Sequence, residues 1–151
     1  MDRQLRAAEL FMEGYNCAQA ITVAYSDLTG LSEKFSAKMP SSFGGGMGRM
    51  REVCCAVSGM LMVAGLLYGY DGPETGLRIK EHYALVQELA ARFRQQTGSI
   101  VCREFLKNPP SDPNPTPMTA EFYKTRPCVR MVMLAVEILD RYIEEHPPVT
   151  Q

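Results

Sequence analysis

Apolar residues recur at helical spacing near both ends of the chain. In the segment 3–12 an apolar face alternates with Arg and Glu on the other side, with the period of 3.6 residues of an amphipathic helix. The segment 127–145 repeats this pattern at greater length, and its expected buried side consists of Val129, Val132, Met133, Val136, Leu139 and Ile143. We therefore predict a helix at each of these two places.

Three further long helices are predicted between these two. Asn16 is a favourable N-cap for one that ends at Gly30. A very apolar one spans about 53–68 and follows a run of glycines. The next runs from Pro73 to about Gln96, because proline suits the first turn of a helix. Its expected apolar stripe is Ile79, Tyr83, Val86, Ala90 and Phe93.

The predicted architecture is all-α, a compact bundle of five to six helices that forms a single domain over residues 1–151. A short helix that holds Cys102, after the capping residue Ser99, is the sixth. No segment alternates as a strand does, and helices with short connections are typical of bundles. Half of the ten prolines fall within 108–117, which predicts an extended loop, and 146–151 are expected to form a tail.

Charge and length narrow the expected partners and location. The formal net charge of −1 gives no electrostatic reason to bind nucleic acid, so no such partner is expected. Residues 53–70 carry no formal charge, at the lower length limit for crossing a bilayer, but Gly and Ser interrupt them. We expect a helix buried in protein, and no membrane span. The N-terminus shows no secretory signal, which predicts a cytoplasmic location, where thiols stay reduced.

All the cysteines fall at or near the start of a predicted helix. They are Cys17, Cys54, Cys55, Cys102 and Cys128. Free backbone N–H groups and the positive end of the helix dipole favour the thiolate there, and the thiolate is both the nucleophile and the metal ligand. Arginines that would add to this effect lie close to two of these starts, namely Arg49, Arg51, Arg126 and Arg130. The alternative interpretation is that each cysteine is a small buried apolar residue.

Neighbouring motifs leave several alternatives open. Consecutive side chains on a helix point about 100° apart, so one of Cys54 and Cys55 is expected to face the site and the other to face elsewhere. Gly44, Gly45 and Gly46 form either a flexible turn, or a set of backbone N–H groups that binds an anion or a cofactor beside the thiols. No cysteine pair has the CxxC spacing of thioredoxin-like enzymes or zinc knuckles.

Five short segments carry a family resemblance when taken in order. They are 14–20 (GYNCAQA), 43–48 (FGGGMG), 55–59 (CAVSG), 98–102 (GSIVC) and 126–128 (RPC). With them the chain resembles the redox-active protein family named for its C…GCAxxG…C…C pattern. The resemblance implies that the four family cysteines are Cys17, Cys55, Cys102 and Cys128, whereas Cys54 stands where the family has glycine. The family is similar to a domain of split-Soret cytochromes, which suggests a helical fold and leaves a homodimer open.

Three functional hypotheses follow. The first is redox chemistry of clustered thiols, by thiol–disulfide exchange or electron transfer, with Cys17 and Cys55 as the first pair and Cys102 and Cys128 as the second. The second is that the same four thiolates bind Zn²⁺ or an iron–sulfur cluster. The third is a non-catalytic helical interaction module. Whether the chain is a thiol-dependent oxidoreductase, and whether its redox partner is a protein, a small thiol or an oxidant, stays open.

Overall fold

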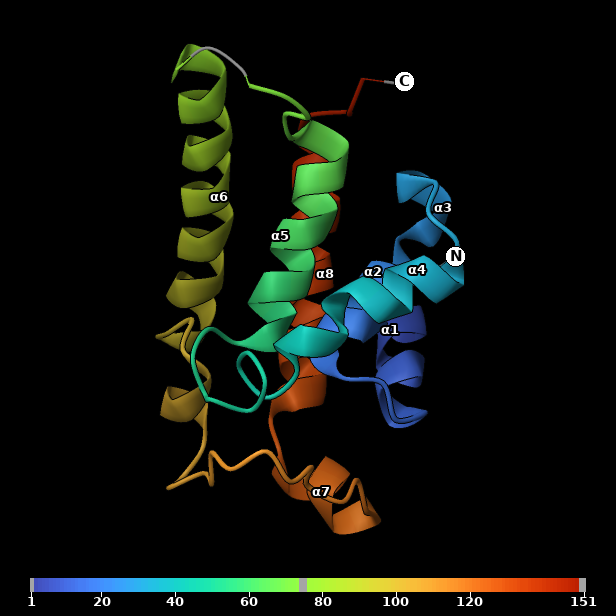
Figure 1. Cartoon of the computed structure of the whole chain (residues 1–151), viewed down its shortest axis with the longest axis vertical. Coiled ribbons are helices and arrows are strands. Elements are labelled where there is room, and N and C mark those ends of the chain that lie inside the picture. The colour runs from blue at the N-terminus through green and yellow to red at the C-terminus, as the bar shows by residue number, and fades with distance from the viewer. Residues whose placement is uncertain (1, 74–75, 150–151) are drawn as a thin grey trace.

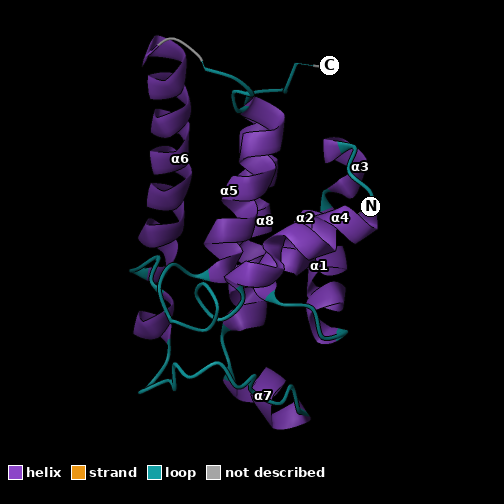
Figure 2. Cartoon of the chain, in the orientation of Figure 1, coloured by secondary structure: helices purple, strands orange, loops and turns teal. Residues whose placement is uncertain are grey.

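The computed structural model describes residues 2–73 and 76–149, and it confirms the all-α prediction. This described part contains eight α-helices, two short 3-10 helices and no strand (Figure 2). The α-helices are α1 (Arg3–Met12), α2 (Cys17–Ala24), α3 (Ser26–Thr29), α4 (Glu33–Lys38), α5 (Cys55–Tyr68), α6 (Gly76–Thr97), α7 (Ala120–Thr125) and α8 (Cys128–Glu145). The 3-10 helices are η1 (Met39–Phe43) and η2 (Cys102–Phe105).

The helix count exceeds the predicted five to six because several helices are short. The helix expected from Asn16 to Gly30 is divided into α2 and α3 at Tyr25, whose φ of −101° and ψ of 8° leave the helical region. The buried Tyr25 side chain is anchored elsewhere, since its hydroxyl donates to Asp140 of α8 over 2.7 Å. Asn16 is the N-cap of α2, as predicted, and its side chain accepts from the Gln19 backbone N–H in a capping box.

The bundle is built around α5 and α8, which contact each other along its centre (Figure 1). α1 packs on α8 and α2, α2 crosses α5, and α6 flanks α5 and α8 at the edge. The crossing of α2 and α5 is close because Gly59 has no side chain. A Cβ there would lie 2.9 Å from the Ala18 Cα. The core at this crossing includes Ile21 and Met60, both fully buried.

The apolar stripe predicted for α6 is partly confirmed, since Phe93 is buried and Ile79, Val86 and Ala90 are half-buried, but it is wrong at Tyr83. The buried residues of α6 are Leu85, Leu89 and Phe93, which form one ridge with a spacing of four, whereas Tyr83 is 55% exposed. Because α6 stands at the edge of the bundle, its neighbours cover a narrow ridge and not a broad face (Figure 1). No helix in the described ranges is long and apolar enough to cross a membrane.

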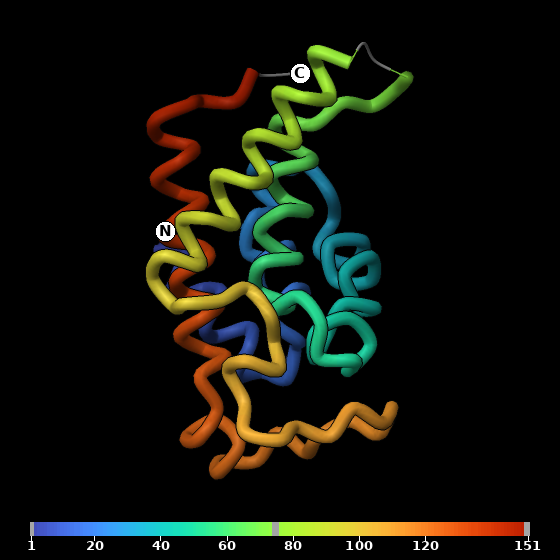
Figure 3. Tube along the Cα trace, turned by 90° about the vertical axis from the view of Figure 1, so that its left-hand side faces the viewer, coloured from blue at the N-terminus to red at the C-terminus, as the bar shows by residue number. Residues whose placement is uncertain are grey.

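Helix N-termini gather at one end of the bundle. α2, α5 and α8 all begin there, and an isolated antiparallel bridge between Val53 and Val101 attaches η2 beside the start of α5. The segment 106–119 contains no helix and passes across the same end (Figure 3). The fold therefore brings residues from four distant parts of the chain to one place.

Candidate functional site

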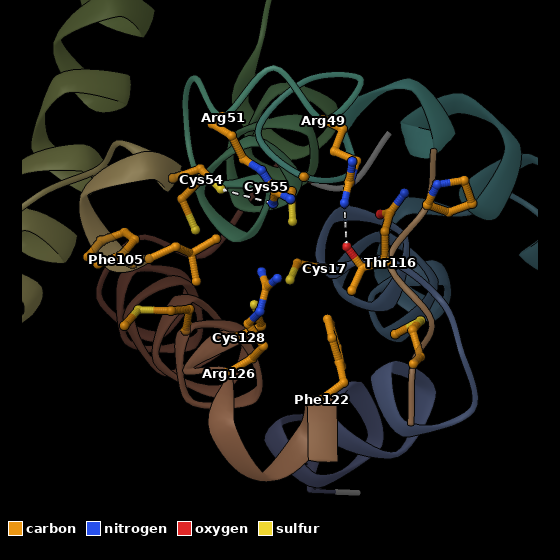
Figure 4. Close-up of a pocket in the computed structure, with 18 of the residues that line it drawn as sticks. Cys17, Arg49, Arg51, Cys54, Cys55, Phe105, Thr116, Phe122, Arg126 and Cys128 are labelled. Carbon is orange, nitrogen blue, oxygen red and sulfur yellow. Dashed lines mark hydrogen bonds between the residues drawn. The ribbon is translucent and has the colours of Figure 1, made fainter. Parts of the chain in front are cut away.

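All five cysteines line one pocket of about 550 Å³ at this end of the bundle (Figure 4). The expectation that Cys54 and Cys55 face different environments is therefore wrong. Cys54 is the N-cap of α5, with an extended ψ of 128°, so the angular spacing of helical side chains does not apply to it. The cysteines share the pocket with aromatic and proline side chains from η2, α7 and the segment 106–119.

The predicted position of the cysteines at helix starts is confirmed. Cys17, Cys55 and Cys128 are the first residues of α2, α5 and α8, and Cys102 is the first residue of η2. The first turn of each helix has backbone N–H groups without a helical acceptor, and its dipole is positive. Three long or medium helices thus direct their positive ends at one cluster of sulfur atoms.

Backbone hydrogen bonds around the bridge place Cys102 beside the start of α5. The Cys54 N–H donates to the Ile100 carbonyl over 2.7 Å, and the Cys102 N–H donates to the Glu52 carbonyl over 2.6 Å. Gly46 lies directly behind this contact with a φ of 74°, and a Cβ at Gly46 would lie 2.7 Å from the Cys102 Cβ. Only glycine combines this backbone conformation with this space.

The thiol of Cys17 is the shared partner of two other thiols. It is buried beside the Cys128 and Cys55 thiols, and its interactions with these two thiols, together with burial, raise the pKa of Cys17 well above its usual value. The contact with Cys17 lowers the pKa of the partly exposed Cys128 to about 7, against the opposing effect of burial and with help from Arg126 and Arg51. Cys17 is thus a protonated donor to a more acidic thiol.

Cys55 occupies the third corner of this cluster. Its pKa is lowered first by the Cys17 thiol and also by the backbone N–H groups of Cys17 and Gly45, while burial and the charge of Cys128 oppose the shift. The contact with Gly45 supports the interpretation of the glycine run as a set of N–H donors beside the thiols. Gly44 and Gly45 line the pocket, and Gly46 is buried behind Cys102.

Cys54 and Cys102 are the less acidic members of the set. Burial, with the charge of Cys55, raises the pKa of Cys54 far above its usual value. Burial also raises the pKa of Cys102, although Arg51 opposes the shift with its Nη1 atom 3.9 Å from the Cys102 Sγ. Cys102 therefore lies in the same pocket as the predicted partner Cys128, but its contact is with Arg51.

Three of the four arginines named from the sequence line the pocket, and Arg130 is exposed outside it. Arg49 pairs with the Asp112 carboxylate at 3.2 Å and donates to the Thr116 hydroxyl at 2.7 Å. Arg51 donates from Nε to the Pro110 carbonyl at 3.0 Å. These contacts hold the proline-rich segment over the thiols. No local pattern predicts this placement, because prolines predict an extended chain without predicting where it packs.

A metal site and a cysteine–histidine pair find less support in the structure. Among residues 2–73 and 76–149, no three Cys, His, Asp or Glu side chains converge in a way that could hold a metal ion. No histidine is found among the described residues that line the pocket. His82 lies on α6, where its ring packs edge-on against Tyr70 at 6.0 Å.

Comparison with known proteins gives a family but no characterised relative. No curated protein and no solved structure matches the chain. Residues 15–142 match the family described as "Putative redox-active protein (C_GCAxxG_C_C)", and this range includes every cysteine and nearly the whole helical bundle. Because the match extends from the start of α2 into the last turns of α8, the chain belongs to this C_GCAxxG_C_C redox-active family.

Proposed function

We propose that this protein is a thiol–disulfide oxidoreductase in which Cys128 attacks and Cys17 resolves. The observation that carries the proposal is the contact of the buried, protonated Cys17 thiol with the more acidic and more exposed Cys128. Attack requires a thiolate, and the best attacking thiol has a pKa near the ambient pH. The pKa of Cys128, lowered to about 7, meets this requirement.

The proposed reaction has two steps. The Cys128 thiolate attacks one sulfur of a disulfide RSSR, which forms a mixed disulfide and releases RS⁻. Cys17 then gives its proton to that departing thiolate or to Cys55, and its own thiolate attacks the Cys128 sulfur. This second step forms a Cys17–Cys128 disulfide and releases the other RS⁻. The chain loses two electrons, and the disulfide substrate gains them.

Cys55 and Cys102 differ in their roles in this scheme. Cys55 is a buried neighbour of Cys17, and the predicted Cys17–Cys55 pair is in contact. We assign Cys55 to accept the proton of Cys17, and to exchange disulfide partners with it. Cys102 contacts Arg51 at the pocket wall and has a raised pKa, so we assign it no part in resolving the mixed disulfide of Cys128 in a single turnover.

The test is the stoichiometry of a single turnover. The reduced chain is mixed with an excess of a small disulfide, and the thiols released per chain are counted. We expect two for the wild type, one for Cys17→Ser because the mixed disulfide cannot be resolved, and a large loss of rate for Cys128→Ser. Release of one thiol by the wild type, or unchanged kinetics in Cys128→Ser, would contradict the proposal.

Binding of Zn²⁺ or an iron–sulfur cluster by Cys17, Cys55, Cys102 and Cys128 remains the second candidate. It is favoured by one observation, that all four cysteines line the same pocket, whereas no three of them converge as metal ligands in the described ranges. Four thiolates are a suitable ligand set for either centre. Anaerobic purification followed by metal analysis and a visible spectrum distinguishes this candidate. A colourless, metal-free, folded protein that reduces disulfides would contradict it.

A further inference from the structure

The pocket carries an excess of positive charge. Three arginines line it, and the described lining residues include no Asp, Glu, Lys or His. Arg49 has a counter-charge in Asp112. Arg51 and Arg126 make no ion pair within the described part of the chain, and the Arg126 guanidinium lies over the Phe122 ring at 5.2 Å. Two guanidinium groups therefore face the thiols without a carboxylate partner.

Arg51 combines an unfavourable burial of its guanidinium group with a strained backbone conformation. It is only 5% exposed, and its Nη2 atom is buried without any hydrogen-bond partner, although Nε and Nη1 are engaged. Its φ of 63° lies in the left-handed region, which a residue with a long side chain seldom adopts. Figure 4 shows Arg51 extending from the glycine-rich loop towards Cys55 inside the pocket. Such strain and unpaired buried donors are concentrated at binding sites.

We infer that the substrate of this pocket is a small disulfide that carries a carboxylate or another oxyanion, which binds to Arg51 Nη2 and to Arg126 beside the thiols. The inference rests on the proposed function. The planar guanidinium suits a carboxylate because it presents two parallel N–H donors. The rest of the pocket suits the body of a small organic molecule, since Phe105, Met118 and Phe122 line it. Its volume of about 550 Å³ is in the usual range for small-molecule sites.

An alternative account of the unpaired arginines is that they only stabilise the thiolates. Arg51 and Arg126 both lower the pKa of Cys128, so their charge has a use without a ligand. With Cys55 also ionised, two thiolates would balance both guanidinium groups, so the charges alone do not decide between the two accounts. The two accounts differ in their expectation for substrates, because arginines that serve only the thiolates would give no preference for a negatively charged disulfide.

The experiment compares three disulfides that differ in charge. They are dithiodipropionate with two carboxylates, hydroxyethyl disulfide with none, and cystamine with two ammonium groups. We expect the reduced wild-type chain to react about tenfold or more faster with dithiodipropionate than with hydroxyethyl disulfide, and slowest with cystamine. Arg126→Gln is expected to lose most of this preference, and Arg130→Gln, which removes the same charge outside the pocket, to keep it.

Binding is measured separately from chemistry. Suberate has the chain length and the two carboxylates of dithiodipropionate but no disulfide, so its binding, followed by calorimetry, does not depend on thiol chemistry. We expect suberate to bind the wild type, and its affinity for Arg126→Gln or Arg51→Gln to be about tenfold lower. Equal rates with all three disulfides, or no binding of suberate, would overturn the inference and leave the proposed function standing. Suberate binding without reaction of any disulfide would instead contradict the proposed function.

Discussion

Replacing Cys17 by alanine removes the largest influence on the acidity of Cys128. The Cys17 thiol is the main cause that lowers the pKa of Cys128 from 9.0 to about 7. Without it, burial acts against the weaker effects of Arg126 and Arg51, so the pKa of Cys128 should return towards its ordinary value. Cys17→Ser is the matched control, because a hydroxyl at this position can still donate a hydrogen bond to the Cys128 sulfur.

The size of the effect follows from two opposing factors. At pH 7 the thiolate fraction of Cys128 falls from about one half to about one hundredth if its pKa rises by two units, a loss of roughly fiftyfold. A more basic thiolate is also a better nucleophile, by roughly six- to tenfold over the same two units. The net rate at pH 7 should therefore fall about five- to eightfold. At pH 10 Cys128 is ionised in both the wild type and the alanine variant, so the alanine variant should react faster than the wild type by roughly six- to tenfold.

The assay is alkylation of Cys128 by iodoacetamide between pH 6 and pH 10, followed at the level of the Cys128 peptide by mass spectrometry. We expect the wild-type and Cys17→Ala profiles to cross near pH 8, and Cys17→Ser to stay close to the wild type. Parallel profiles, or an inflection near pH 7 in Cys17→Ala, would refute the argument that Cys17 controls the acidity of Cys128.

Four other outcomes are expected. Asn16→Ala removes the cap of α2 and should lower the free energy of unfolding by about 1 kcal/mol in denaturant titration, with Asn16→Ser close to wild type; no change would contradict the capping role. Gly59→Ala should destabilise by about 1–3 kcal/mol, because its Cβ would lie 2.9 Å from the α2 backbone. Gly65→Ala meets nothing within 4 Å and should stabilise by up to about 1 kcal/mol, and similar values for the two glycine variants would refute the close crossing. Cys54→Gly should leave the rate of disulfide reduction within about twofold of wild type, since burial and the charge of Cys55 raise the pKa of Cys54 and keep it protonated at neutral pH. The pKa of Cys128 is lowered on folding, so its ionisation stabilises the fold above pH 9, and this contribution is lost as the pH falls through about 7. The difference in unfolding free energy between wild type and Cys128→Ala should therefore grow by about 2–3 kcal/mol from pH 6 to pH 9. A difference that stays constant over this range would contradict the lowered pKa.

Local signals in the sequence were sufficient for much of the fold. The N-cap Asn16 acts within one turn of helix, so the sequence alone places the start of α2 well. The division of the second predicted helix at Tyr25 depends on a hydrogen bond to Asp140 in α8, which no local pattern reveals. The register of α6 likewise depends on which neighbours cover it.

The candidate site shows the same division between local and tertiary causes. The placement of Cys17, Cys55 and Cys128 at helix starts was predictable, because caps, proline and glycine determine where helices begin. Their convergence on one pocket was not, because it depends on the crossing of α2, α5 and α8. The role of Arg51 was only partly predictable. Its proximity to a helix start was visible in the sequence, but its buried, unpaired Nη2 atom was not.

The account depends on Cys17 being the shared partner of Cys55 and Cys128, and the disulfide that forms on oxidation reports this arrangement. The reduced chain is oxidised with a stoichiometric amount of hydroxyethyl disulfide, quenched in acid, alkylated and mapped by mass spectrometry. We predict an intramolecular Cys17–Cys128 disulfide, with Cys54 and Cys102 still alkylated as free thiols. An oxidised chain in which Cys17 remains a free thiol would contradict the account.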